Sequence, residues 1–223
     1  MAKKLRVGVL ASGGGTDLQS IIDASKNNMI DAEVKVVISD NKSAFALKRA
    51  GKNKIKTFFI NPKGKEKEDF DKEIDKILEE NNIELVVGAG YMRMLSSCFV
   101  RKWYGKLINI HPALLPSFKG TNGQLDALNY GVKISGCTTH FIDEKMDHGP
   151  IILQAAVKVM PCDDRDKLAH RILEVEHQIL PRTIDLFAKK YIKIDGRIVK
   201  IKKDDSWKDK YKIFPNVLYS EGY

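Results

Sequence analysis

Four apolar runs of strand length lie in the first half of the chain, and helical or glycine-rich segments separate them. They are residues 5–11, 34–38, 55–60 and 83–89. The last run is apolar almost throughout, as expected for a parallel strand covered on both faces. After the first run, Leu18, Ile21 and Ile22 recur on one face of a helix that begins at Thr16. Repeated units of this kind predict an α/β fold with an open, doubly wound, mostly parallel sheet of Rossmann-like type.

Two more helices are expected between these strands. One is short and covers residues 44–50, and the other carries an apolar stripe made of Phe70, Ile74, Ile77 and Leu78. Both fit helices that pack on the faces of a sheet.

The C-terminal half is less regular. Strands are expected at residues 106–110, 137–142 and 151–159, and a short helix at residues 123–130. One face of a long helix is marked by Leu168, Ile172, Val175 and Ile179. Pro181 is expected to end or kink this helix. Residues 192–201 have Asp195-Gly196 at their centre, which predicts a β-hairpin.

Length and composition bound the number of domains. With 223 residues, 43% of them hydrophobic, the chain can bury a single core. It shows no repeat, low-complexity tract or flexible linker. We therefore expect one domain over residues 1–223, with a basic C-terminal appendage at about residues 191–223. No apolar run approaches the ~20 residues that a bilayer span requires, so no membrane partner is expected.

The cysteines and the N-terminus indicate a cytoplasmic location. Cys98, Cys137 and Cys162 are odd in number and form no C-x-x-C pair, which fits a reducing compartment and the absence of a zinc site. The apolar run after the basic N-terminus is too short for the core of a signal peptide.

The formal charge of +9 raises the alternative of a basic nucleic-acid-binding module. Most of the excess lies in residues 189–212, however, and no RNA- or DNA-binding motif accompanies it. A solvated basic tail is therefore the preferred interpretation, and no nucleic-acid partner is expected.

The glycine loop after the first strand is a candidate anion site. Residues 12–17 read Ser-Gly-Gly-Gly-Thr-Asp, and glycines allow close backbone approach while a helix N-terminus offers free N–H groups. The loop is not a Walker motif, and Leu18 stands where the dinucleotide fingerprint has its third glycine. A capped turn without a ligand remains the alternative.

A second candidate site lies at the end of an apolar strand. Asn109 and His111 are two residues apart, so they share one face of the strand at its carboxyl end. An amide donor beside an imidazole suits stabilisation of an oxyanion together with proton transfer to or from an amine. No serine or cysteine stands in an activating motif, which favours direct transfer without a covalent enzyme intermediate.

The residues around this strand resemble a known signature. Residues 108–120, Ile-Asn-Ile-His-Pro-Ala-Leu-Leu-Pro-Ser-Phe-Lys-Gly, are similar to that of the folate-dependent formyltransferases, in particular the branch acting on phosphoribosylglycinamide. Residues 12–19 resemble the family's phosphate loop, residues 88–95 its folate-side loop and residues 143–150 its catalytic aspartate loop. Glu176-His177 also matches. The resemblance covers residues 5–190 approximately and implies the formyltransferase version of the Rossmann-like fold.

The resemblance implies a reaction. A formyl group would pass from the co-substrate 10-formyltetrahydrofolate to the amine of 5-phosphoribosylglycinamide, in de novo purine (IMP) biosynthesis. Direct attack through a tetrahedral intermediate would accomplish this without a metal. The implied partners are small-molecule substrates only, and the implied assembly is a monomer or homodimer.

The resemblance also assigns residues. The catalytic group comprises Asn109, His111 and Asp147, with Asn109 and His111 as donors to the oxyanion and Asp147 paired with His111. The substrate-binding group comprises Gly14, Gly15, Thr16, Asp17, Pro112, Leu173 and Glu176. The folate-binding group comprises Lys67, Met92, Arg93, Met94, Leu95, Asn109, Asp143, Glu144, Lys145, Met146 and Asp147.

Three positions depart from the family pattern. Asp17 stands where many members have asparagine, and Leu173 where they often have a polar residue. His148 replaces a small residue and is a rival proton carrier to the preferred His111. His140 and His170 are expected to be structural or solvent-facing.

Relatives with the same catalytic core are the remaining alternatives. They are formyltetrahydrofolate deformylase, methionyl-tRNA formyltransferase and sugar-nucleotide formyltransferases. The first carries an added N-terminal domain and the second a sizeable C-terminal domain. The length of this sequence therefore favours the glycinamide branch.

Overall fold

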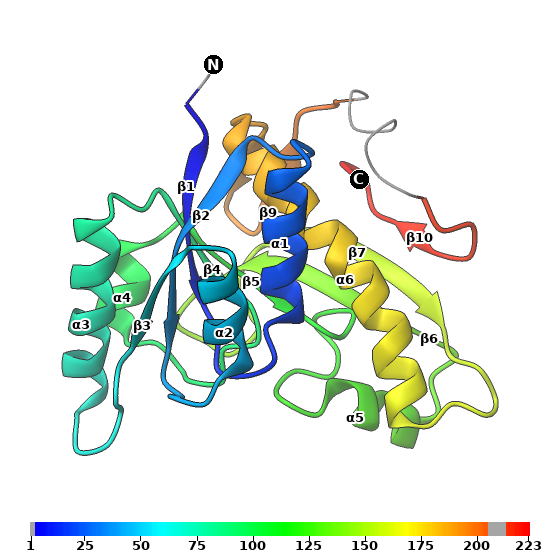
Figure 1. The fold of residues 1–223 in the computed structure, drawn as a ribbon. Helices are drawn as coiled ribbons and strands as arrows, with labels where there is room; N and C mark the ends of the chain where they lie inside the picture. Colours follow the sequence, from blue (N-terminus) through cyan, green and yellow to red (C-terminus); the bar gives the residue numbers. More distant parts are fainter. Residues whose placement is uncertain (1–2, 205–212) are drawn as a thin grey trace.

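The computed structural model describes residues 3–204 and 213–223 (Figure 1). Its parallel strands are β1 (Leu5–Leu10), β2 (Ala32–Ser39), β3 (Lys56–Phe59), β4 (Leu85–Gly88) and β5 (Leu107–His111). Antiparallel strands follow, namely β6 (Ile134–Phe141), β7 (Ile151–Lys158) and β10 (Leu218–Tyr219). The strands form one sheet in the order β10-β7-β6-β5-β4-β1-β2-β3. The predicted doubly wound, mostly parallel sheet is confirmed.

Helices cover both faces of this sheet (Figure 1). They are α1 (Thr16–Lys26), α2 (Phe45–Lys52), α3 (Lys67–Glu80), α4 (Ser97–Lys102), α5 (Gly123–Tyr130) and α6 (Arg165–Ala188). One apolar cluster joins the sheet to α1, α2 and α6, and the other joins it to α3 and α4. Within β4, Leu85 and Val87 belong to the first cluster and Val86 to the second. This alternation explains the apolar character of the whole strand.

The long helix α6 does not end at Pro181, so of the two outcomes expected there, an end or a kink, the end is wrong. The helix continues to Ala188, and the residues on either side of the proline are fully buried against the sheet. Beyond the proline, the Thr183 hydroxyl donates to the Ile179 carbonyl at 2.8 Å. Tertiary packing of this buried segment therefore outweighs the backbone hydrogen bond that proline removes.

Part of the basic appendage packs on the body of the protein. The hairpin of β8 (Ile192–Asp195) and β9 (Ile198–Ile201) turns at Gly196, which has a φ of 61°. Four side chains of the hairpin pack on the core, namely Ile192, Ile194, Val199 and Ile201. The apolar side chains of the hairpin are thus packed, while its basic side chains Lys193, Arg197 and Lys200 are exposed, as expected for a solvated charge. Residues 205–212 lie outside the described residues.

A buried ion network holds the last residues in place. The fully buried Arg182 of α6 pairs with Asp185 and Asp204, both at 3.3 Å, and donates to the Gly222 carbonyl at 3.0 Å. Lys189 contacts the same two carboxylates at 2.9 and 3.2 Å. The C-terminal segment is thus tied to α6 by charge pairs away from water.

The sheet also brings the predicted site segments together. Leu10 of β1 is in register with Gly88 of β4, and Gly88 with Asn109 of β5. The loops that follow these three strands therefore leave the same edge of the sheet. Within the described ranges, no helix combines the length and hydropathy that a bilayer span requires.

Candidate active site

A cavity of about 290 Å³ lies at this edge. The loop after β4, the end of β5 and residues 143–147 form much of its wall. Thirteen predicted site residues line it: Asp17, Met92, Arg93, Met94, Leu95, Asn109, His111, Pro112, Asp143, Lys145, Met146, Asp147 and Glu176. The topology thus collects residues from distant parts of the chain, as open α/β sheets do beyond the carboxyl ends of their strands.

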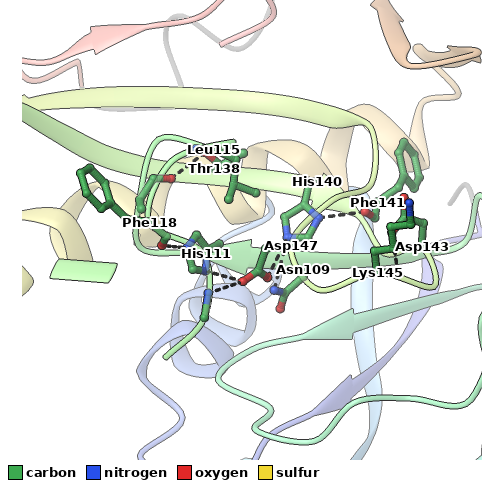
Figure 2. A network of polar contacts seen from close by, with 12 residues as sticks. Asn109, His111, Leu115, Phe118, Thr138, His140, Phe141, Asp143, Lys145 and Asp147 are labelled. Carbon is green, nitrogen blue, oxygen red and sulfur yellow. Dashed lines mark hydrogen bonds and ion pairs between the residues drawn. The ribbon is translucent and has the colours of Figure 1, made fainter. Parts of the chain in front are cut away.

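His111 is held between a carbonyl and a carboxylate (Figure 2). Its Nε2 lies 2.8 Å from the Phe118 carbonyl oxygen, and its Nδ1 lies 3.5 Å from Oδ2 of Asp147. A carbonyl oxygen only accepts, so Nε2 carries a proton. The same Asp147 oxygen accepts a 2.8 Å hydrogen bond from the Gly120 amide. The carboxylate is therefore fixed in place while it faces the imidazole.

His140 adjoins the same residues, which the sequence analysis did not anticipate. It is paired with Asn109 across β5 and β6 and is buried, with 1% of its surface exposed. Its Nδ1 donates to the Phe141 carbonyl at 2.8 Å, and its Nε2 lies 3.4 Å from Nδ2 of Asn109 and 3.8 Å from Asp147 (Figure 2).

The surroundings of His140 favour its neutral form. Burial lowers the pKa of its ring despite the nearby carboxylate. With Nδ1 protonated, Nε2 of the neutral ring is an acceptor for the amide of Asn109. His140 is therefore buried and not solvent-facing, which agrees with the structural alternative, and its Nε2 is placed to accept from the amide of Asn109.

The loop that carries Asp147 is tightly folded. Asp147 has a φ of 45°, a left-handed conformation that is costly for a residue with a Cβ atom. At Gly149, a Cβ atom would lie 1.8 Å from the Phe141 carbonyl oxygen, so only glycine fits there. His148 places its Nδ1 2.6 Å from Oδ2 of Asp143 and is not part of the cavity wall.

The glycine loop leads directly into the N-terminus of α1, as the sequence predicts. Gly15 caps α1 with a φ of 69°, and a Cβ atom there would lie 2.7 Å from Ala46. Arg49 of α2 donates from Nε to the Gly14 carbonyl at 2.9 Å, which places a guanidinium beside the loop. Thr16 and Arg49 line a second cavity of about 430 Å³.

Two buried carboxyl groups face the main cavity near this loop. Burial raises the pKa of Asp17 to about 6. Burial, and then the charge of Asp17, raise the pKa of Glu176 well above its usual value. Oδ1 of Asp17 lies 3.8 Å from Nε2 of His177, and neither atom has a hydrogen-bond partner in the described part of the protein.

The remaining predicted residues do not line the main cavity. They are Gly14, Gly15, Thr16, Lys67, Glu144 and Leu173. Glu144 instead pairs with Arg101 of α4 at 2.9 Å. Lys67 begins α3, where its charge, with that of Arg93, acts on the buried Asp71. Among the described residues, no group of three His, Cys, Asp or Glu side chains is arranged to hold a metal ion.

Several residues at the site were not assigned to it in the sequence analysis. They are Tyr91, Gly120 and His140, which line the cavity, Phe118, which contacts His111, and Arg49. Tyr91, Phe118 and Gly120 do lie in segments that resemble the family. The sequence shows which side chains alternate along β6. It does not show the register of β6 on β5, which places His140 opposite Asn109. Arg49 stands in an expected helix, and only the packing of that helix brings it to the glycine loop.

Comparison with known proteins gives a consistent result. The family model described as formyl transferase matches residues 5–184. The phosphoribosylglycinamide formyltransferase of Escherichia coli is 38% identical over 212 residues, which cover 95% of this chain and 97% of that protein. The human trifunctional purine biosynthetic protein adenosine-3 is 43% identical over 205 residues. This match covers 91% of the chain but only 20% of the human protein.

A solved structure agrees with these matches. The crystal structure of glycinamide ribonucleotide transformylase 1 from Symbiobacterium toebii superposes with a TM-score of 0.89 at 41% identity. The alignment covers 91% of this chain and 96% of that one.

Proposed function

The chain belongs to the formyl transferase family, and we propose that it transfers the formyl group of 10-formyltetrahydrofolate to the amine of 5-phosphoribosylglycinamide. The arrangement of Asn109, His111 and Asp147 at one wall of the cavity is the observation that carries the proposal. The coverage and identity of the Escherichia coli relative support the acceptor.

The reaction needs a donor for the oxyanion and a route for one proton. The amine nitrogen attacks the formyl carbon, and the carbonyl electrons move to oxygen. Asn109 Nδ2 presents a second N–H beside the one directed at His140. The Nδ1 atom of His111 lies 3.5 Å from Asp147, and in the proposed reaction this side of the imidazole is the second group that faces the oxyanion.

Collapse of the tetrahedral intermediate completes the transfer. The bond between the formyl carbon and N10 of the folate breaks, and the electron pair stays on N10. The proton lost by the amine balances the one gained by N10. During this exchange, His111 and Asp147 stabilise the charge of the intermediate and carry the proton that passes from the amine to N10. No covalent bond to the protein forms.

The cavity wall suits a flat, partly apolar co-substrate. Its apolar side chains include Leu95, Val100 and Ile142, while Met92, Met94 and Met146 are exposed at the surface. Methionine side chains adapt to irregular ring systems. The backbone of residues 90–95 and 143–147 supplies donors and acceptors for the polar edge of a pteridine. We assign these two segments to the folate.

The glycine loop and the buried carboxyl groups are assigned to the other substrate. The first-turn N–H groups of α1 face a phosphate, with Arg49 adding a positive charge. Glu176 and Asp17 lie between this loop and the cavity, where they accept hydrogen bonds from hydroxyl or amine groups.

A steady-state assay tests the proposal. Purified protein with 10-formyltetrahydrofolate and phosphoribosylglycinamide should release tetrahydrofolate and form the formylated acceptor in equal amounts, measured by absorbance and mass spectrometry. No metal or nucleotide is added. Release of formate at the same rate without the acceptor would instead identify a deformylase.

We also propose that the enzyme is cytoplasmic, acts on small molecules and is a monomer or homodimer. The free thiols of Cys98, Cys137 and Cys162 support a reducing compartment. The ion pairs of Lys189 and the packing of the hairpin support a structural use of the basic appendage over nucleic-acid binding.

A further inference from the structure

The turn of the C-terminal hairpin reaches the loop that carries Asp147. Nη1 of Arg197 donates to the His148 carbonyl at 2.6 Å and lies 3.4 and 3.5 Å from the two ring nitrogens of His148. Forty-nine positions separate these residues in the sequence. The contact is charge-assisted and joins two segments that have no local reason to meet.

His148 in turn contacts Asp143, at the start of the loop formed by residues 143–148. Its Nδ1 lies 2.6 Å from Oδ2 of Asp143, and the other carboxylate oxygen accepts from the Lys145 amide at 2.9 Å. Burial alone would raise the pKa of Asp143, but these hydrogen bonds and the charges of His148 and Arg197 lower it. Arg197, His148 and Asp143 therefore form a closed clasp across residues 143–148, with the carboxylate ionised.

Asp147 needs such support. Its φ of 45° lies in the left-handed region, which residues with a Cβ atom adopt rarely, aspartate and asparagine more readily than others. Strained residues of this kind persist where their surroundings fix them. Gly120 holds the side chain of Asp147, and Arg197 holds the carbonyl of the very next residue.

The hairpin gives Arg197 a firm base. Ile194 and Val199, which flank the turn in register, pack on the core of the domain. Arg197 is exposed at this turn, and the hydrogen-bond contacts of its side chain within residues 3–204 and 213–223 are those with His148.

We infer that Arg197 is a positioning residue for Asp147, acting through the clasp that it forms with His148 and Asp143. The inference rests on the proposed function, because it assigns Asp147 to catalysis. In this view His148 has a structural role in the aspartate loop and does not transfer protons. The basic appendage contributes to the reaction by positioning Asp147.

Two single variants test the inference. Arg197→Gln removes the charged donor, while Lys200→Gln removes the same charge from the same hairpin, where Lys200 pairs with Asp195 and, among the described residues, does not contact the aspartate loop. Arg197→Gln should lower kcat roughly tenfold with little change in KM, since a small displacement of a catalytic group lowers the rate. Lys200→Gln should leave kcat unchanged, and Arg197→Lys should restore much of it. Equal kcat values in the two glutamine variants would overturn the inference.

A double-mutant cycle separates positioning from general damage. In an Asp147→Asn background, Arg197→Gln should have no further effect on kcat, because the group that it positions is already neutral. Additive losses in the double variant would overturn the inference.

Hydrogen exchange of residues 143–149 provides a readout that is independent of the substrate. Arg197→Gln should speed exchange there relative to wild type, and Lys200→Gln should not. If the wild-type protein does not formylate phosphoribosylglycinamide, the proposed function fails while this comparison still decides whether the clasp holds the loop. Unchanged exchange in Arg197→Gln would overturn the clasp itself.

Discussion

Oδ2 of Asp147 lies 3.5 Å from Nδ1 of His111 and is held there by the Gly120 amide. The carboxylate is nearly buried, with 12% of its side chain exposed, so water screens this pair only weakly. The geometry makes the charge of Asp147, more than its shape, the property on which the site depends.

Asp147→Asn should therefore lower kcat by about two to three orders of magnitude, as loss of a preorganised charge does. The fold should survive because the amide oxygen still accepts from Gly120. Steady-state rates and a thermal melt measure both effects. Asp126→Asn, an exposed change on α5, is the control. A loss below about fivefold would show that another group serves His111.

His140→Phe should lower kcat by roughly tenfold, the scale of a misoriented donor. The phenyl ring keeps the volume but removes the acceptor that faces the Asn109 amide. KM for the folate should change less than kcat. His170→Phe, at an exposed position of α6, provides the control. Equal rates for both variants would refute the orienting role of His140.

Arg49→Gln should raise KM for the phosphorylated substrate about tenfold, the worth of roughly one charge-assisted hydrogen bond. The kcat value should stay close to that of wild type because Arg49 lies beside the phosphate loop, outside the wall of the main cavity. Lys48→Gln removes the neighbouring charge on the same helix as a comparison. If the two variants have the same KM, the phosphate lies elsewhere.

Asp17→Asn should raise the free energy of unfolding, and the effect should appear only as the pH rises above about 4. The folded-state pKa of Asp17 is about 6, against 3.8 for the free group. Between these values the unfolded chain is ionised while the folded protein keeps its proton, so stability falls as pH rises. Asparagine lacks this penalty.

The stability difference between Asp17→Asn and wild type should therefore be smallest near pH 4 and grow to about 3 kcal/mol above pH 6. Urea unfolding at several pH values measures it. Asp126→Asn should show no such growth. A difference that is constant with pH would contradict the burial of an uncompensated carboxyl group at Asp17.

Asp185→Asn should cost about 3 kcal/mol, because it leaves the buried charge of Arg182 with less compensation. Urea unfolding again gives the free energy. Asp166→Asn, in the exposed first turn of the same helix, should cost less than about 1 kcal/mol. Similar costs for the two variants would mean that the network contributes little to stability.

The sequence predicted the parts of the fold that depend on local patterns. Apolar runs and helical spacing located β1 to β5, and the i, i+2 relation of Asn109 and His111 placed both on one face of a strand. Asp195-Gly196 located the hairpin. These signals are properties of neighbouring residues, so they can be read without knowledge of the tertiary structure.

The missed features depend on contacts between distant segments. Strand β10 has two residues and exists only by pairing with β7. His140 enters the site through the register of β6 on β5. Arg197 reaches His148, next to Asp147, through the packing of the hairpin. The helix α6 continues past Pro181 because this segment is buried against the sheet, and burial of this kind cannot be read from the neighbouring residues alone.

The pairing of β10 with β7 bears on association between molecules through the edge of the sheet. Leu218 and Tyr219 occupy hydrogen-bonding positions along the outer side of β7. An uncovered strand edge is a template for addition of a strand from another chain. Residues 218–219 cover this edge at Ala155 and Ala156, and a molecule that loses them would expose these positions of β7 to strands of other chains.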